Sequence, residues 1–243
     1  MDFALNSDQQ ELKAAARSWL AEKFPLDRDW ENQDDRWSEL VDLGWTDVAE
    51  AGLGFVEEAL LLEELGYALY PGPFLQHVTG LINDGAHTVD ATRPLATPPI
   101  ETAKLRAAMA AEAVGVAQRA LDLGIEHAKT REQFGKPIGT YQAVAHPLAQ
   151  TYTDVELARS LAYWAAWCVA ENDDRAALAA ASAKAFATEA AVAACERSIQ
   201  VHGGTGFTWE HPLHRFYKRA IWLEGFGTRP SALRLEVATA LLT

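Results

Sequence analysis

Residues 104–142 read KLRAAMAAEAVGVAQRALDLGIEHAKTREQFGKPIGTYQ. The spacing of Leu105, Met109 and Leu123 places them on related faces of one helix, so the stretch predicts a long amphipathic helix that ends near Thr130. A loop that contains glycine and proline follows it. Long helices joined by short loops are typical of helical bundles, and we take this stretch as the centre of one.

The same spacing of apolar residues recurs on both sides and predicts further helices over residues 7–20, 37–44, 54–70, 147–172, 173–201, 211–223 and 231–242. Ser7 and Gln10 have the spacing of a capping box, and Gly44 suits a helix C-terminus. Pro147 is acceptable in a first turn. Strand-like alternation is almost absent, so we predict an all-α fold with a C-terminal bundle of the four-helix type.

Residues 82–103 interrupt the helical pattern. They contain the turn signal Asn83-Asp84-Gly85, several prolines and few large apolar residues, which indicates an extended connector. The chain therefore divides into an N-terminal helical domain over residues 1–81, a connector over residues 82–103 and a C-terminal helical bundle over residues 104–243.

The composition argues against several classes of function. Of 243 residues, 49% are hydrophobic, which is enough for a sizeable core. The formal net charge of −13 argues against nucleic acid and anionic membrane surfaces, because both require clustered Lys and Arg. Cys168 and Cys195 form neither a disulfide framework nor a metal pattern, so we expect a reducing cytoplasm. We also expect no targeting segment and no membrane-spanning helix.

Two segments depart from simple amphipathic helix. The first, Arg131–Gln142, is a Gly- and Pro-containing loop with two cations, and Arg can bind phosphate oxygens in a bidentate manner. The second, QVHGGTGF over residues 200–207, has a Gly pair that would let backbone N–H groups approach a ligand closely. Taken alone, either segment is more typical of a plain helix–helix turn.

Together, the two segments resemble the two signatures of the acyl-CoA dehydrogenases, and the resemblance covers roughly residues 1–80 and 104–225. In that family the first signature surrounds the FAD pyrophosphate, and the second meets the adenosine part of an FAD bound mainly by a neighbouring subunit. The resemblance implies that Arg131 contacts the pyrophosphate and that Phe134 packs beside the cofactor. It also implies hydrogen bonds or close approach, partly across a dimer interface, at Gln142, Gln200, Gly203 and Gly204.

Residues 209–219 resemble the form found in heteromeric family members of steroid side-chain breakdown. The resemblance implies an FAD cofactor, an acyl-CoA substrate and an oligomer, formed either by copies of this chain or with an acyl-CoA dehydrogenase homologue. No metal is predicted, because no Glu-x-x-His pair recurs on two helices and no His-Glu-x-x-His occurs.

The chain departs from the family in its middle domain. In the family, a β domain between the helical halves covers the flavin ring and lines the acyl-CoA path. Here only the connector over residues 82–103 stands in that place, and about twenty residues cannot build a barrel. Residues 89–95 resemble the end of that domain. We therefore expect the β domain to be deleted internally and the chain alone to hold FAD weakly.

The second departure is the catalytic base. The family reaction needs a carboxylate within reach of the substrate α carbon. In the commonest family pattern, counting without gaps from Ala220 places Gly227 at the base position, and glycine cannot take a proton. A register with a three-residue deletion places Glu224 there instead. Other members carry the base on the first bundle helix, where the matching Leu105 is not an acid and Glu112 lies two turns further on.

Three hypotheses follow from these features. The first is an FAD-linked acyl-CoA dehydrogenase-type subunit that shares its active site with a partner, which supplies the β domain and the base. The second is a subunit that is catalytic alone, with Glu224 as the base. The third is a non-catalytic stabilising subunit of a heteromeric acyl-CoA dehydrogenase.

Overall fold

The computed structural model describes residues 4–48, 51–80 and 101–242. Its helices are α1 (Ser7–Lys23), α2 (Trp37–Asp42), α3 (Phe55–Ala68), α4 (Phe74–Thr79), α5 (Ala103–Thr130), α6 (Gln142–Ala170), α7 (Ala176–His202), α8 (Leu213–Gly225) and α9 (Pro230–Leu242). Between α5 and α6 lie β1 (Glu132–Gln133), β2 (Lys136–Pro137) and the 3-10 helix η1 (Ile138–Thr140); a second 3-10 helix, η2 (Gly203–Phe207), follows α7. The all-α prediction is confirmed, and the described residues contain no strands besides this two-stranded hairpin.

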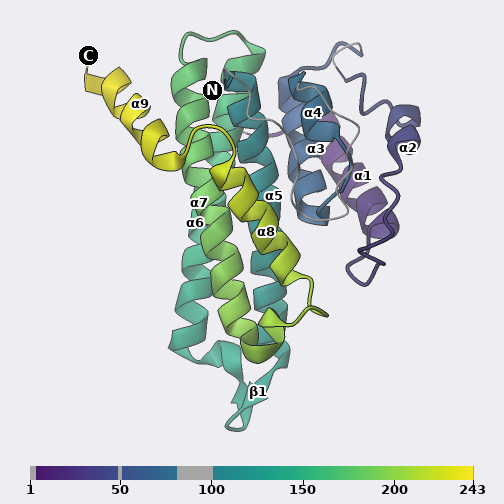
Figure 1. Ribbon diagram of the computed structural model, residues 1–243, viewed down its shortest axis with the longest axis vertical. Coiled ribbons are helices and arrows are strands. Elements are labelled where there is room, and N and C mark those ends of the chain that lie inside the picture. Colours follow the sequence, from purple (N-terminus) through teal and green to yellow (C-terminus); the bar gives the residue numbers. More distant parts are fainter. Residues whose placement is uncertain (1–3, 49–50, 81–100, 243) are drawn as a thin grey trace.

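The C-terminal half is a bundle built around α7 (Figure 1). This helix packs against α5, α6, α8 and α9. Nine of its fourteen buried residues are alanine, and such small side chains let the neighbouring helices approach closely. Among the described residues, Ala176–Phe207 is the one helical stretch with the length and apolar content of a membrane span, and 67% of its apolar window is buried, as suits the central helix of a bundle.

The N-terminal helices pack on the bundle mainly through the contact of α3 with α5 (Figure 1). Two glycines make this contact close. A Cβ added at Gly66 would overlap the main chain of Glu112, and one added at Gly115 would overlap the main chain of Glu63. Because the two backbones touch at these points, only glycine can occupy them without moving the helices apart.

A buried carboxylate ties α1, α3 and α6 together. Glu63 is 1% exposed and accepts hydrogen bonds from Arg159 Nε at 3.0 Å and Tyr163 Oη at 2.6 Å. Its Oε1 also lies 2.9 Å from Lys13 Nζ. Burial opposes ionisation of Glu63, but the charges of Lys13 and Arg159 outweigh burial and lower its pKa. The ion cluster therefore fixes the position of three helices relative to one another.

Some predicted boundaries were wrong. The N-cap of α1 is Asn6, not Ser7: Asn6 Oδ1 accepts from Gln9 N at 2.8 Å, and Gln9 Oε1 accepts from Asn6 N at 3.1 Å. Helix α6 begins at Gln142, because the Tyr141 carbonyl already accepts from two later amides, and this places Pro147 inside the helix. Helix α4 was not predicted. Most of the predicted connector, residues 82–100, lies outside the described residues, so the domain boundaries remain predictions.

Candidate functional site

The two segments singled out in the sequence lie at the same end of the bundle (Figure 1). One is the hairpin between α5 and α6, and the other is the turn between α7 and α8. They meet through His127 on the last turn of α5 and His202 at the end of α7, whose rings stack at 4.2 Å between centroids. The fold therefore brings together segments that are about seventy residues apart in the sequence.

Arg131 and Phe134 occupy exposed positions in the first segment. Arg131 follows α5 as its C-cap, where its amide donates to His127 O at 2.9 Å. Its guanidinium has no hydrogen-bond or ion-pair partner among the described residues. Phe134 is 93% exposed at the hairpin tip, with a φ of +54°. Gln142, the first residue of α6, is also exposed. All three side chains are free to contact a ligand or another chain.

The second segment offers open backbone. Gln200 is exposed on the last turn of α7, and Gly203 ends that helix with a φ of +61°. A Cβ added at Gly203 or Gly204 would have no neighbour within 4 Å, so both α carbons face open space. The Gly203 amide itself donates to Gln200 O and Ile199 O. By contrast, a Cβ added at Gly206 would lie 2.7 Å from Ile199 O, so this glycine is required by the turn itself.

These residues suit one side of a dinucleotide site. An unpaired guanidinium can bind phosphate oxygens, and glycines whose missing side chains face open space let a ligand approach the backbone closely. The fit to FAD is one-sided, because the described residues at this end of the bundle form an exposed surface and not an enclosed pocket. The cofactor would be held firmly only if another surface enclosed it opposite Arg131, Gln142, Gln200 and the Gly203–Gly204 pair.

Sequence reasoning missed a stack of three histidines beneath this surface. The His202 ring lies between those of His127 and His211, at 4.2 and 4.5 Å. Burial, followed by His202 and Arg131, lowers the pKa of His127, and burial with the neighbouring histidines lowers the pKa of His211 to about 4. No group of three metal-ligating side chains occurs in the described part of the chain. One sequence feature could have predicted this contact: His127 and His202 each fall near the end of a predicted bundle helix.

The expected base position at Gly227 is occupied by an ion cluster from elsewhere in the chain. Gly227 has a φ of +69°, and a Cβ added there would lie 2.6 Å from Glu101 Oε1 and 3.4 Å from Lys184 Nζ. Lys184 is fully buried, forms an ion pair with Glu101 and donates to Phe226 O at 2.6 Å. Arg106 Nε donates to Glu101 Oε2 at 3.0 Å.

This cluster cannot easily supply a proton acceptor. Burial raises the pKa of Glu101, but hydrogen bonds from Lys184, Thr228 and Arg106 outweigh burial and lower it. A carboxylate held by two cations is a weak base. Sequence reasoning missed this cluster as well. The sequence feature that could have indicated a buried ion pair is Lys184, a lone cation in an alanine-rich helix.

The other candidate carboxylates lie in different surroundings. Glu112 is 2% exposed and forms an ion pair with Arg219, so it is bonded to a neighbour and is not available as a base. Glu224 is half-buried on α8. Burial, with the charges of Glu189 and Glu196, raises its pKa. Among the candidates, Glu224 is the carboxylate whose surroundings favour holding a proton.

Comparison with known proteins agrees with this geometry. Residues 101–228 match the family model of the acyl-CoA dehydrogenase C-terminal domain. The chain is 40% identical over 131 residues to acyl-CoA dehydrogenase IpdE2 of Mycobacterium tuberculosis, an alignment that covers 54% of this chain and 39% of that protein. It is 41% identical over 138 residues to the probable acyl-CoA dehydrogenase YngJ of Bacillus subtilis, covering 56% and 36%.

These alignments span well under half the length of the two relatives. The fold is also that of a chain in the ChsE4–ChsE5 complex from Mycobacterium tuberculosis, with a TM-score of 0.79 at 20% identity over 99% of both chains. The family match covers more than half of the chain and includes the hairpin and turn described above. The chain belongs to the acyl-CoA dehydrogenase family.

Proposed function

We propose that this chain is an FAD-linked acyl-CoA dehydrogenase-type subunit that shares its active site with a homologous partner subunit. The observation that carries the proposal is the contrast between two regions of the chain. The cofactor-type residues Arg131, Gln142 and Gly203–Gly204 are open and unobstructed, whereas the base position at Gly227 is filled by Glu101 and Lys184.

The reaction explains why a partner is needed. Dehydrogenation of an acyl-CoA removes a proton from the α carbon and a hydride from the β carbon, and bound FAD would supply the hydride acceptor. The proton requires a free carboxylate near the α carbon. Glu101 is pinned by Lys184 and Arg106, so this chain provides the cofactor grip, and the partner provides the base and the missing wall.

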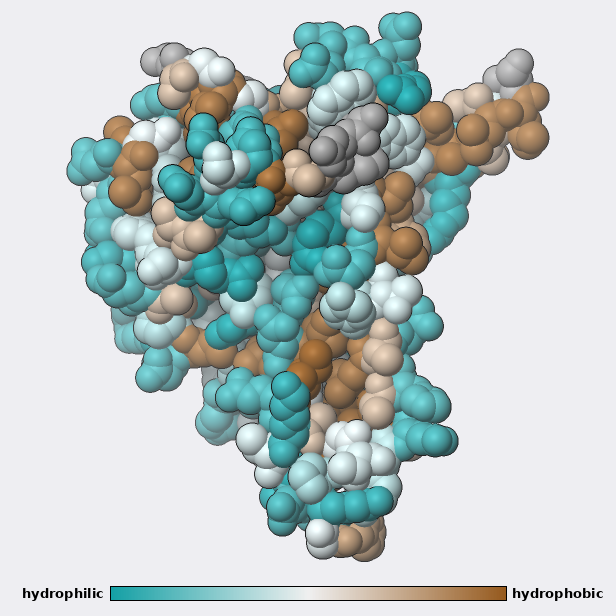
Figure 2. All heavy atoms as spheres, turned by 180° about the vertical axis from the view of Figure 1, so that it is seen from behind, coloured by the Kyte–Doolittle hydropathy of each residue, from teal (hydrophilic) through white to brown (hydrophobic). Residues whose placement is uncertain are grey.

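Exposed apolar side chains supply a surface for such a partner. Phe134 and Phe207 are 93% and 75% exposed on the two cofactor-type segments, residues 131–142 and 200–207, and the nearby Trp209 is 60% exposed. Leu241 and Leu242 are 68% and 87% exposed near the end of α9, which projects from the molecule as a hydrophobic arm (Figure 2). Apolar patches of this kind mark protein interfaces. The ChsE4–ChsE5 neighbour is itself a complex.

Two other functions remain as candidates. A subunit that is catalytic alone would use Glu224, whose pKa is raised by burial and by the charges of Glu189 and Glu196. Glu224→Gln should then abolish turnover and leave flavin bound. A purely structural subunit is the other candidate, because Glu101 is bound by Lys184 and Arg106 and cannot act as a base. Such a subunit would not need Arg131.

The test is to purify the chain alone and together with candidate acyl-CoA dehydrogenase homologues, and to record the flavin absorbance and mass of each sample. We expect stable flavin and activity only in the complex. Arg131→Ala should release flavin from that complex. Arg175→Ala, at the opposite end of the bundle, is the matched control and should not. A monomeric, colourless chain that associates with no homologue would overturn the proposal, and a complex whose flavin survives Arg131→Ala would favour a structural role.

A further inference from the structure

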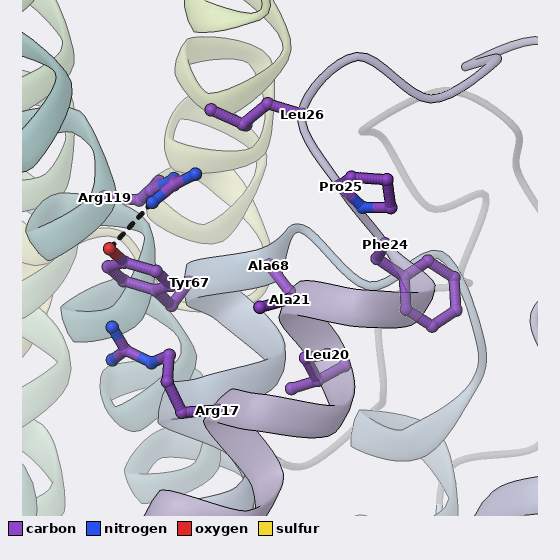
Figure 3. A pocket seen from close by; sticks show the side chains of 9 residues that line it. All are labelled: Arg17, Leu20, Ala21, Phe24, Pro25, Leu26, Tyr67, Ala68 and Arg119. Carbon is purple, nitrogen blue, oxygen red and sulfur yellow. Dashed lines mark hydrogen bonds between the residues drawn. The ribbon is translucent and has the colours of Figure 1, made fainter.

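A separate cavity of about 220 Å3 lies between the end of α1, the end of α3 and the middle of α5 (Figure 3). It is distant from the cofactor-type segments, because Arg119 precedes Arg131 by twelve residues on α5, which is about 18 Å along a helix axis. Its wall is polar on one side and apolar on the other. The polar side is formed by Arg17, Tyr67 and Arg119, and the apolar side by Leu20, Phe24 and Leu26.

The polar side is a phenol ring between two guanidinium groups (Figure 3). The Cζ atoms of Arg17 and Arg119 lie 3.4 and 4.7 Å from the centroid of the Tyr67 ring. Tyr67 Oη donates to Asp122 Oδ2 at 2.8 Å, which orients its oxygen to accept from Arg119 Nη1, also at 2.8 Å. This arrangement holds both cations at fixed positions on the cavity wall.

The two arginines differ in their partners. Arg17 forms an ion pair with Glu64. Arg119 makes its one hydrogen bond within the described residues to the neutral oxygen of Tyr67, and it has no ion-pair partner there. A guanidinium has five N–H donors, so most of the donors of Arg119 are unused at the edge of the cavity. They are suited to the two oxygens of a carboxylate.

Two further arginines near the cavity also lack an acid. Arg28 donates to main-chain carbonyls, including Phe24 O at 2.8 Å and Ala68 O at 3.1 Å, and Arg215 lies over Trp30. Neither has an ion-pair partner in the described ranges. Burial and the charges of Arg215, Arg219 and Arg119 lower the pKa of Arg28 to about 9, so it stays charged at neutral pH.

This concentration of positive charge runs against the composition of the chain. The sequence has 34 acidic and 21 basic residues, yet Arg28, Arg119 and Arg215 form no ion pair within the described residues. The nearby carboxylate of Asp122 accepts from Tyr67 and reaches Arg119 only through the Tyr67 hydroxyl. Like charges held close together destabilise the folded chain, and a bound anion would remove that repulsion. The apolar side chains of Leu20, Phe24 and Leu26 would accept the rest of an amphipathic ligand.

We infer that the cavity binds a small organic carboxylate, with its head on Arg119 and a short alkyl or aryl group against Leu20 and Phe24. A cavity of about 220 Å3 is far larger than a single water molecule requires and has room for one such ligand. This site is independent of the flavin-linked function proposed above, because it shares no residue with the cofactor-type segments.

The test uses the full chain and hexanoate, with binding measured by isothermal titration calorimetry. Hexanol, which has a similar tail and no charge, should bind at least about tenfold more weakly. Arg119→Met keeps much of the side-chain stem but removes the charge. It should weaken hexanoate binding by a similar factor. Arg229→Met, at an exposed arginine outside the cavity, is the matched control and should leave binding unchanged.

A second variant tests the cavity without removing a charge. Ala21 is exposed at the cavity rim, so Ala21→Phe should fill the space and abolish hexanoate binding while the circular-dichroism spectrum stays that of the wild type. This variant carries the test if Arg119→Met does not fold. The proposal is overturned if hexanoate gives no saturable heat, if hexanol binds equally well, or if a folded Arg119→Met or Ala21→Phe variant binds hexanoate as the wild type does.

Discussion

At the scale of single residues, Gly227 is the expected base position, and its surroundings are already filled by other groups. Its positive φ and the nearby Glu101 leave no room for a side chain. The carboxylate that does reach this place arrives from the residues before α5 and is neutralised by Lys184 and Arg106. The expected base position and a buried ion pair therefore occupy the same place in the fold.

Introducing an acid at Gly227 should damage the fold and not create a base. Gly227→Glu places a non-glycine residue at a φ of +69° and a second carboxylate beside Glu101. We expect the free energy of unfolding to fall by about 2 kcal/mol or more, from backbone strain and like-charge repulsion. Urea unfolding measures this change.

The matched control for that variant is Gly225→Glu, because a Cβ at Gly225 meets nothing within 4 Å. It should change stability by less than about 0.5 kcal/mol. An unchanged unfolding midpoint for Gly227→Glu, or dehydrogenase activity gained by the chain alone, would contradict this account of the position.

The histidine stack predicts a pH dependence of stability. The pKa of His211 falls from 6.5 to about 4 in the folded chain, mainly through burial. Above pH 6.5 both states are neutral at this residue and its contribution is fully present. As pH falls from 6.5 to about 4, the unfolded chain takes up a proton that the folded chain resists, so stability decreases over that window.

His211→Gln removes this titration. The variant should lose less stability than the wild type between pH 7 and pH 5, as measured by urea unfolding at both values. His77→Gln is a useful control, because the ring of His77 contacts Trp37 among the N-terminal helices and not the other histidines. Equal losses in the wild type and His211→Gln would show that the stack does not resist protonation.

At the scale of secondary-structure elements, the contact between α3 and α5 joins the two halves of the chain. It depends on Gly66 and Gly115, whose missing side chains allow main-chain contact. Around this contact the acidic residues of α3 are paired, with Glu63 held by Lys13 and Arg159. Apolar packing and ion pairs therefore fix the same helix crossing.

Gly115→Ala should weaken that crossing. The added methyl group overlaps the main chain of Glu63, and overpacking of this kind costs about 1–3 kcal/mol. Thermal or urea unfolding should show the loss. Gly225→Ala, in open space at the end of α8, should be neutral or slightly stabilising, since alanine favours helix over glycine. If Gly115→Ala were as stable as this control, the backbone contact would not determine the crossing.

The positions of helices could be predicted where the helical spacing of apolar residues continues over a long stretch. The end of α5 at Thr130 and the positions of α8 and α9 follow directly from it. The start of α1 could not be predicted in this way. Asn6 with Gln9 and Ser7 with Gln10 have the same capping-box spacing, so the sequence pattern does not distinguish the two starts. Gln9 Nε2 also donates to Glu57 Oε1 of α3 at 2.8 Å, and this tertiary contact accompanies the observed register.

At the scale of the whole molecule, the exposed apolar groups indicate assembly. Phe134 makes few contacts within the chain because it is 93% exposed. Phe134→Ser should leave the melting temperature of the isolated chain nearly unchanged, within about 0.5 kcal/mol of stability. It should weaken association with the partner or retention of flavin, measured by size-exclusion chromatography and absorbance.

Leu53→Ser is the control for that comparison, since Leu53 is 46% exposed but lies in the N-terminal domain. It should affect neither association nor flavin. If both substitutions weakened the complex equally, general surface hydrophobicity would explain the result, and the hairpin tip would have no special role.

The sequence by itself determined the all-α class, the family and the residues that compose the two cofactor-type segments, because apolar periodicity and short motifs are local properties of a chain. The tertiary structure alone decided which distant groups meet. It placed His127 against His202, brought Glu101 to Gly227, and left Arg119 beside a cavity with no ion pair among the described residues. These contacts depend on how helices far apart in sequence pack, and no local pattern records that.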